Sequence, residues 1–534
     1  MTSLSALQSA LTPSSLASTA GRNAGSAAAS RTTQTQVPAA PQQSTVVTLG
    51  ANNVSQVADP TYSIPSIGAA AGTVWQVRSN DAVSSLMAGN FFSRSVVNRF
   101  SGIGSALLGM LRDGAQGFTQ SVALDSSAAT ALAAVGTQKA AYPQADEKLV
   151  VKTKSGVEVE ISLSTQDDKL QVQMQSSGEL SDAERVALGK LAEGFQDAID
   201  GIGTKPPQLK LAGLTNFDAT VLSSVEFHAS VTLDSKGPQT LSFNADSVSR
   251  SVKLDGPLGT LDVSVDMRDF SIWGNSKQRD AAVNNYLKQF DQAAKRGNAD
   301  KELMGLFKDA FTQMNSDYVK PEGQQARISL ADVDHAMLSG MADFKASVKQ
   351  VPQSPNPKLL SELDTFAYEA SQKTDIAPTN QANRSVSQQQ RSRLTASYHM
   401  SLVPDVPLVL TADNKSQNYY YKEIDDAADS TVGFSYTKGV LSEAFAIQSA
   451  QQSTRTRKYE LGTLTDDATS PFNASLKRDI LATLKPFLED LGDKSASEMF
   501  DWQQKLEEVH GQILLQSDPA KLNDNSWSLS GTKE

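Results

Sequence analysis

The sequence contains no cysteine and only four histidines among its 534 residues. The absence of cysteine excludes disulfides, iron–sulfur clusters, thiolate zinc sites and thiol nucleophiles. The histidines are far apart in sequence, and none forms the His-x-x-x-His pair with which a helix binds zinc; they are His228, His335, His399 and His510. We therefore expect no metal and no cofactor, and few side chains can exchange protons near neutral pH.

Long apolar runs and common catalytic motifs are also missing. No run of about eighteen apolar residues occurs, so we expect no transmembrane helix. The first residues lack a basic start followed by an apolar core, which predicts a cytoplasmic location or export without a cleaved signal peptide. The glycines around Gly102-Ile103-Gly104-Ser105 match neither Gly-x-Ser-x-Gly nor a phosphate-binding loop. Asp332-Val333-Asp334-His335 is the nearest candidate for a hard-metal site, but acidic residues in the first turn of a helix are the favoured interpretation.

Aromatic residues are scarce at 6%, whereas 39% hydrophobic and 20% charged residues are typical of a soluble globular protein. The formal net charge of -11 opposes a phosphate backbone, so we do not expect a nucleic-acid partner. Residues 1–65 are rich in Ser, Thr, Ala and Gln and hold few large apolar side chains. Such a segment cannot offset its ordering entropy by burial, which predicts a disordered head.

The next two regions predict helices followed by a sheet. Residues 66–147 are apolar, and spacings of three and four from Ala82 to Val122 predict helix with a break near Gly102. Residues 148–274 alternate with a period of two, which predicts an antiparallel sheet that begins with a three-stranded meander. Ser181 and Glu184 form a capping-box pair between its two strand groups, so one helix should pack on that sheet.

The remaining chain predicts helices, strands and helices again. Residues 275–375 are expected to be helical: a helix pair spans Lys277 to Met314, and two further helices begin near Ser329 and Lys358. The polar stretch from Asp375 to Gln390 is typical of a linker. Residues 376–465 are otherwise strand-rich, and residues 466–534 hold C-terminal helices and a tail, the first helix starting at Ser470-Pro471. The predicted fold class is α+β, with antiparallel strand-rich regions, packed helices and a disordered N-terminal segment; one sheet or several is left open.

The strand-rich region at residues 376–465 holds the candidate partner-binding residues. Alternation places the two arginines of each strand on a common side, and tyrosines add flat aromatic faces. The candidates are Arg391, Arg393, Tyr398, Tyr420, Arg455 and Arg457. A basic patch of this kind suits an anionic glycan, a nucleic-acid strand or an acidic protein. The alternative is the wet face of an antiparallel sheet, in which each arginine lies opposite an acidic residue.

These observations favour a non-enzymatic interaction or structural protein with a protein partner. Its unfolded head would serve as a tether, an assembly segment or an address for a bacterial export route that needs no signal peptide. Two alternatives stay open: a hydrolase that uses two carboxylates on a glycan, and an intracellular adaptor whose head folds on binding. The sequence predicts no oligomeric state.

Overall fold

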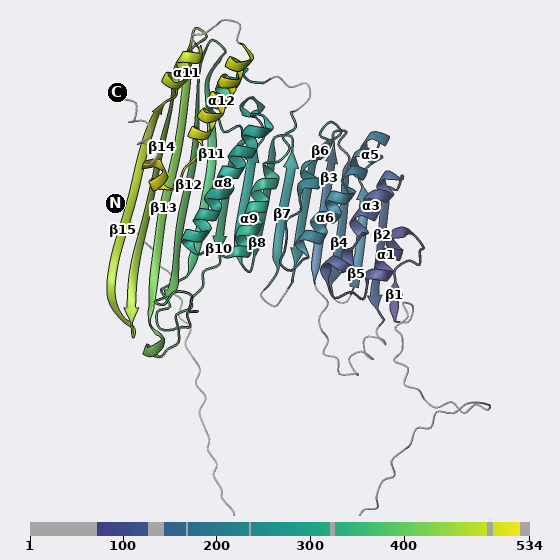
Figure 1. Cartoon of the computed structure of the whole chain (residues 1–534). Coiled ribbons are helices and arrows are strands. Elements are labelled where there is room, and N and C mark those ends of the chain that lie inside the picture. The colour runs from purple at the N-terminus through teal and green to yellow at the C-terminus, as the bar shows by residue number, and fades with distance from the viewer. Residues whose placement is uncertain are drawn as a thin grey trace, which may run out of the picture. The chain divides into compact units, whose positions relative to one another are not determined.

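The computed structural model describes residues 72–125, 144–166, 169–233, 237–320, 326–488 and 495–523. The predicted disordered head lies outside these residues. Fifteen strands of the described chain form one sheet in the order β1-β2-β5-β4-β3-β6, after which each strand to β15 lies beside its predecessor (Figure 1). Every pairing between these strands is antiparallel. The predicted α+β class is confirmed, and the strand-rich regions belong to a single sheet.

The first half of the chain holds nine described strands, of which the last seven were predicted from alternating hydrophobicity and the first two were not. The nine strands are β1 (Thr73–Trp75), β2 (Gly117–Leu124), β3 (Ala145–Thr153), β4 (Glu158–Gln166), β5 (Lys169–Ser176), β6 (Leu222–Val231), β7 (Gln239–Asp246), β8 (Ser249–Gly256) and β9 (Gly259–Asp266). The meander β3–β4–β5 is confirmed, and β3 joins it to the second strand group by pairing with β6. Helix was expected as far as Val122, but this end of the segment forms β2 instead.

The second half of the chain holds six described strands, and the last five of them are much longer, with 16 to 21 residues each. The six strands are β10 (Asp343–Gln350), β11 (Thr365–Asn380), β12 (Asn383–Ser401), β13 (Tyr419–Thr437), β14 (Val440–Glu460) and β15 (Thr463–Asp479). The helix expected near Lys358 is therefore wrong, and the expected linker Asp375–Gln390 is the β11–β12 hairpin. The helix expected at Ser470-Pro471 is also wrong, because both residues lie in β15, the last strand of the order, where an edge position tolerates proline.

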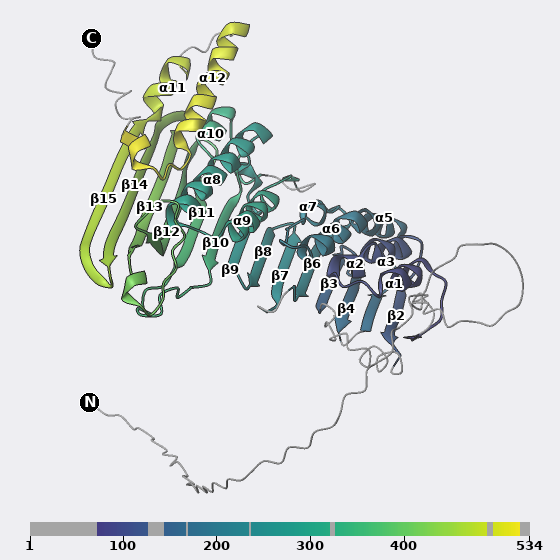
Figure 2. The same cartoon turned by 60° about the horizontal axis from the view of Figure 1, so that its bottom comes forward.

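Helices cover one face of this sheet (Figures 1 and 2). They are α1 (Ala82–Asn90), α2 (Val96–Phe100), α3 (Ile103–Arg112), α5 (Asp182–Lys190), α6 (Ala192–Ile202), α7 (Ala212–Thr215), α8 (Ser276–Gly297), α9 (Lys301–Met314), α10 (Asp332–Ala336), α11 (Ile480–Leu488) and α12 (Ala496–Ile513), with short 3-10 turns at Phe270–Ile272 and Asn414–Ser416. Near Ser329 only the five-residue α10 forms.

Local sequence signals place several helix ends, including the predicted break near Gly102 and the predicted capping box at Ser181. Gly102 has a φ of +72° between α2 and α3, which is the expected break. Ser181 and Glu184 form the capping box of α5, with Ser181 N–H donating to Glu184 Oε2 at 2.8 Å. Asn298 takes the left-handed conformation that ends α8 before α9 begins.

The core lies between the helices and the sheet. In β4, for example, Val159, Ile161 and Leu163 are buried, whereas the residues that alternate with them lie on the other face. We call that other face, which the helices do not cover, the open face. His228 lies on the open face and is exposed, as its position in the alternation predicts.

Candidate functional site on the open face

A trough crosses the open face from β9 to β15. It has a volume of about 950 Å³ and is lined by residues of these seven consecutive strands. Most of its side chains fall into two rows of directly opposed residues. One row is Ser264, Lys345, Ser371, Arg391, Asp429, Ser449 and Ser475, and the next is Asp262, Ser347, Glu369, Arg393, Ala427, Gln451 and Asn473. Six spacings of about 4.8 Å between neighbouring strands make the trough about 29 Å long.

The lining of the trough is polar, short and balanced in charge. Its acidic side chains are Asp262, Glu369 and Asp429, and its basic side chains are Lys345, Arg391 and Arg393. Serine, alanine, glutamine and asparagine make up the rest, and no aromatic residue occurs among the described residues that line it. Such a surface offers many hydrogen-bond donors and acceptors but little net charge and no stacking platform.

The two predicted arginines of β12 lie in this trough. Arg391 donates from Nε to Asp429 Oδ2 at 2.9 Å, and Arg393 donates to Asp425 Oδ1 at 3.2 Å, both across the β12–β13 pair. Both arginine side chains remain 62% exposed. Because a guanidinium has five N–H donors, each arginine keeps most of its hydrogen-bonding capacity for solvent or a partner.

The two predicted arginines of β14 belong to a different group on the same face. Arg455 makes two hydrogen bonds to Asp467 on β15, at 2.8 and 2.7 Å, and an ion pair with Glu423 at 3.4 Å. Arg457 bridges Glu423 and Glu362 at 3.3 Å each and lies over the ring of Tyr421. Neither arginine lines the trough.

The two predicted tyrosines lie on the opposite face from the four arginines. In β12 and β13 the odd-numbered residues around Arg391 and Asp429 face the trough, so Tyr398 and Tyr420 point to the helix side of the sheet. The structure therefore brings Arg391 and Arg393 together in the trough, places Arg455 and Arg457 beside it, and separates both tyrosines from all of them.

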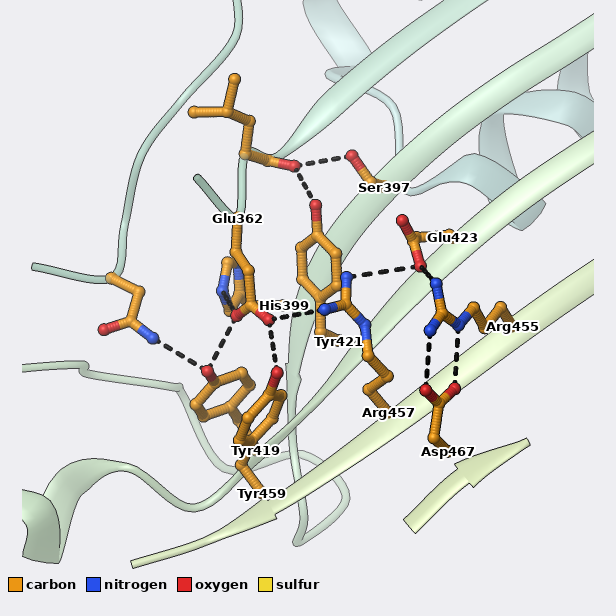
Figure 3. A network of polar contacts seen from close by, with 12 residues as sticks. Glu362, Ser397, His399, Tyr419, Tyr421, Glu423, Arg455, Arg457, Tyr459 and Asp467 are labelled. Carbon is orange, nitrogen blue, oxygen red and sulfur yellow. Dashed lines mark hydrogen bonds and ion pairs between the residues drawn. The ribbon is translucent and has the colours of Figure 1, made fainter. Parts of the chain in front are cut away.

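A buried polar network, which we call the clasp, lies at one end of the open face (Figure 3). It joins the clasp loop, residues 351–364 between β10 and β11, to side chains of β12, β13 and β14. Glu362 is at its centre: Tyr419 and Tyr459 each donate a hydroxyl to this carboxylate at 2.8 Å. Tyr419 and Tyr459 stack with ring centroids 4.7 Å apart, so the carboxylate closes over a packed pair of rings.

His399 lies between two carboxylates of the clasp loop. Its Nδ1 is 2.6 Å from Asp364 Oδ1 and its Nε2 is 3.2 Å from Glu362 Oε2. Burial alone would lower the pKa of His399, but the hydrogen bonds to both carboxylates outweigh burial and raise this pKa above 6.5. Burial likewise would raise the pKa of Glu362, and the donors His399, Tyr419 and Tyr459 together lower it.

The clasp is closed to ligands. The side chain of His399 is 1% exposed and that of Glu362 is 5% exposed. The clasp also holds the backbone: Tyr421 and Ser397 both donate hydroxyls to the carbonyl of Leu363, at 2.9 and 2.6 Å. An imidazole between two acidic side chains resembles a catalytic group in composition, but here it holds a loop against the sheet. Because the clasp is buried, the trough is the candidate functional site.

The Asp332–His335 segment is a structural anchor. Asp334 is fully buried in α10, pairs with Arg384 of β12 at 2.7 Å and accepts the hydroxyl of Tyr436 of β13 at 2.6 Å. The predicted location at the start of a helix is correct, and this acid serves to dock that helix on the sheet. Among the residues that the structure describes, no group of three or more potential ligands could hold a metal ion.

Sequence reasoning missed the acidic and small residues of the trough. Asp262, Lys345 and Glu369 come from β9, β10 and β11. Only the pairing order β9–β10–β11–β12 aligns Lys345 with Arg391, and Asp262 and Glu369 with Arg393. Their one sequence signal is alternation with buried residues, as in β9 and β10. This alternation predicts a solvent-exposed face of the sheet, but it does not predict a trough on that face.

Comparisons with known proteins give no assignment: no family model, no curated protein and no solved structure matches this chain. In the described part of the chain, no helix has both the length and the apolar character needed to cross a membrane.

Proposed function

We propose that this chain is a non-enzymatic binding protein whose trough holds an extended segment of a protein partner. The observation that carries this proposal is the pair of residue rows across β9–β15, which line an open trough of about 950 Å³ with hydrogen-bonding side chains. A length of about 29 Å matches about eight or nine residues of extended polypeptide.

The chemistry of the lining favours a polypeptide over the other ligands considered. A nucleic-acid strand requires an excess of positive charge and aromatic stacking, whereas the trough balances three acids with three bases. An anionic glycan would also require cations without acidic neighbours, but Arg391 already contacts Asp429. Serine, glutamine and asparagine side chains can instead satisfy the alternating donors and acceptors of a peptide backbone.

The hydrolase alternative has less support. Two catalytic carboxylates must lie about 5 to 9.5 Å apart. The acids of the trough lie on alternate strands, namely Asp262 on β9, Glu369 on β11 and Asp429 on β13, so the intervening strand separates their backbones by about 10 Å or more.

Site-specific photo-crosslinking in the cells that make the protein tests the proposal. A benzophenone amino acid replaces Ser371 or Ser449 in the trough, and the same amino acid at Ser162 of β4, on the open face outside the trough, serves as the control. We expect both trough positions to crosslink one and the same protein, and Ser162 not to do so.

A blocking variant sharpens the result. Ser475→Trp introduces a large side chain into the trough and should abolish the adduct formed from Ser371, whereas Ser164→Trp on β4 should leave this adduct unchanged. Adducts that form equally well from Ser162, or that survive Ser475→Trp, would contradict binding in the trough.

Export without a signal peptide is a separate part of the proposal, supported by the composition of residues 1–65. Fractionation of cells that express the full chain or a variant lacking residues 1–50 tests it. We expect the full chain outside intact cells and the shortened chain inside; the same distribution for both would refute this role of the head.

A further inference from the structure

The two edges of the sheet differ greatly in length. At one end of the strand order β1 has three residues, and at the other end β15 has seventeen. In the part of the chain that the structure describes, β15 pairs only with β14, so its outer backbone edge has no partner strand. An unpaired edge of this length is a template for another strand, and proteins commonly shorten or cover such edges.

We propose that the outer edge of β15 pairs with the β15 edge of a second copy of this chain, antiparallel and centred on Phe472. A two-fold axis perpendicular to the sheet keeps the helices of both copies on one side of the joined sheet. Odd-numbered residues must then lie opposite odd-numbered residues, and even-numbered residues opposite even-numbered ones. The strand must therefore be self-complementary about one residue.

The sequence of β15 meets this requirement in the register centred on Phe472. Asp466 then lies opposite Arg478 of the second copy, and Asp467 lies opposite Lys477. The two-fold axis generates each pair twice, so four pairs of opposite charge flank the centre. A shift of the centre to Asn473 would place Asp467 opposite Asp479, and a shift to Pro471 would leave every charged residue opposite an uncharged one.

Phe472 supplies an apolar contact at the axis. Its side chain is 44% exposed and lies on the helix side of the sheet at the edge, where the ring of the second copy would lie directly opposite. Pro471 has no N–H, so at most one ladder hydrogen bond is lost on each side of the axis. Residues 461–473 are all exposed in the single chain, and pairing would cover this edge.

The pairing would also extend the trough. Asn473 and Ser475 of β15 belong to the lining, so the trough reaches the edge at which the second copy would join. The dimer itself does not rest on the proposed function of the trough, because its evidence is confined to β15.

Charge exchange between two variants tests the register. Lys477→Asp places an acid opposite Asp467 of its own second copy, and Asp467→Lys places a lysine opposite Lys477, so each variant alone should dimerise about tenfold more weakly than the wild type. A mixture of the two variants pairs opposite charges at both positions and should restore the dimer. Lys253→Asp, an exposed change on the inner strand β8, is the matched control and should dimerise as the wild type does. Analytical ultracentrifugation of the full chain measures all five samples: the wild type, the two variants, their mixture and the control.

A second test uses the absence of cysteine in the natural chain. Phe472→Cys places the only thiol on the axis, where paired strands bring the two Cα atoms within about 5.5 Å, close enough for a disulfide. Oxidation should produce a covalent dimer on a non-reducing gel, whereas Asn473→Cys, which lies opposite Pro471 and not opposite itself, should crosslink far more slowly. A wild-type chain that stays monomeric at every concentration, or a dimer insensitive to Lys477→Asp, would overturn the proposal.

Discussion

Replacement of Glu362 by glutamine should release the clasp loop. The carboxylate receives four donors, two at each oxygen: Tyr459 and Arg457 at Oε1, and Tyr419 and His399 at Oε2. A glutamine keeps one oxygen and presents an amide N–H₂ group to the two donors that the other oxygen served. Each buried donor without an acceptor costs about 1 to 3 kcal/mol, so we expect the loop to be held less tightly by about 3 kcal/mol.

Hydrogen–deuterium exchange of peptides from the clasp loop measures this effect directly. Because 1.4 kcal/mol corresponds to a tenfold change in an equilibrium constant, a loss of about 3 kcal/mol should accelerate exchange there about 100-fold. Glu460→Gln is the matched control: this glutamate pairs with Lys458 at 2.6 Å and its side chain is 47% exposed. A surface ion pair contributes about 1 kcal/mol or less, so the control should accelerate exchange about fivefold at most. If Glu362→Gln behaves like Glu460→Gln, the clasp does not hold the loop.

Three further predictions concern pH, a buried ion pair and helix packing. The pKa of His399 is raised in the folded protein, so protonated His399 stabilises the clasp loop fully below about pH 6.5, and this stabilisation is lost as pH rises through the folded pKa. Hydrogen exchange of the loop, corrected for the intrinsic pH dependence of exchange, should therefore accelerate with pH. His399→Gln should abolish this acceleration. Asp334→Asn breaks the buried pair with Arg384 and should lower the free energy of unfolding by about 3 to 5 kcal/mol in urea titrations; a loss below about 1 kcal/mol would contradict this. Gly297→Ala in α8 places a Cβ 2.7 Å from a ring carbon of Phe366 and should lower the free energy of unfolding by about 1 to 3 kcal/mol. Gly305→Ala in α9 places its Cβ in open space and should raise the free energy of unfolding by up to about 1 kcal/mol. Equal effects of the two substitutions would refute the packing argument.

The sequence predicted those strands that alternate apolar and polar residues. It failed for the β11–β12 hairpin because glutamine occupies buried positions there. Gln388 and Gln390 are buried beneath helices and bond to backbone atoms, for example Gln388 Oε1 to Ser339 N–H at 2.8 Å. A composition rich in Gln, Asn and Ser therefore conceals a strand whose inner face is packed through side-chain amides.

The candidate site was only partly accessible to sequence reasoning. Alternation placed Arg391 and Arg393 on one side of a strand, and the structure shows them in the trough. The same reasoning could not separate Arg455 and Arg457 from them, because their contacts to Asp467 and Glu362 depend on strand register and on a loop that returns over the sheet. Parity within β12 alone separates Tyr398 from Arg391 and Arg393, but the prediction grouped the tyrosines by residue type. Tyr420 lies on β13, and parity within one strand says nothing of how a neighbouring strand aligns.

From β7 to β15 every strand lies beside the strand that precedes it in the chain. Contacts in this part of the sheet therefore link segments that are close in sequence, and the architecture approaches a linear array of nearest-neighbour units. Duplication or loss of one hairpin within this array would change the width of the sheet by two strands and preserve the order of all the others. The length of the trough is thus a property that gene duplication can adjust in steps, about 10 Å at a time.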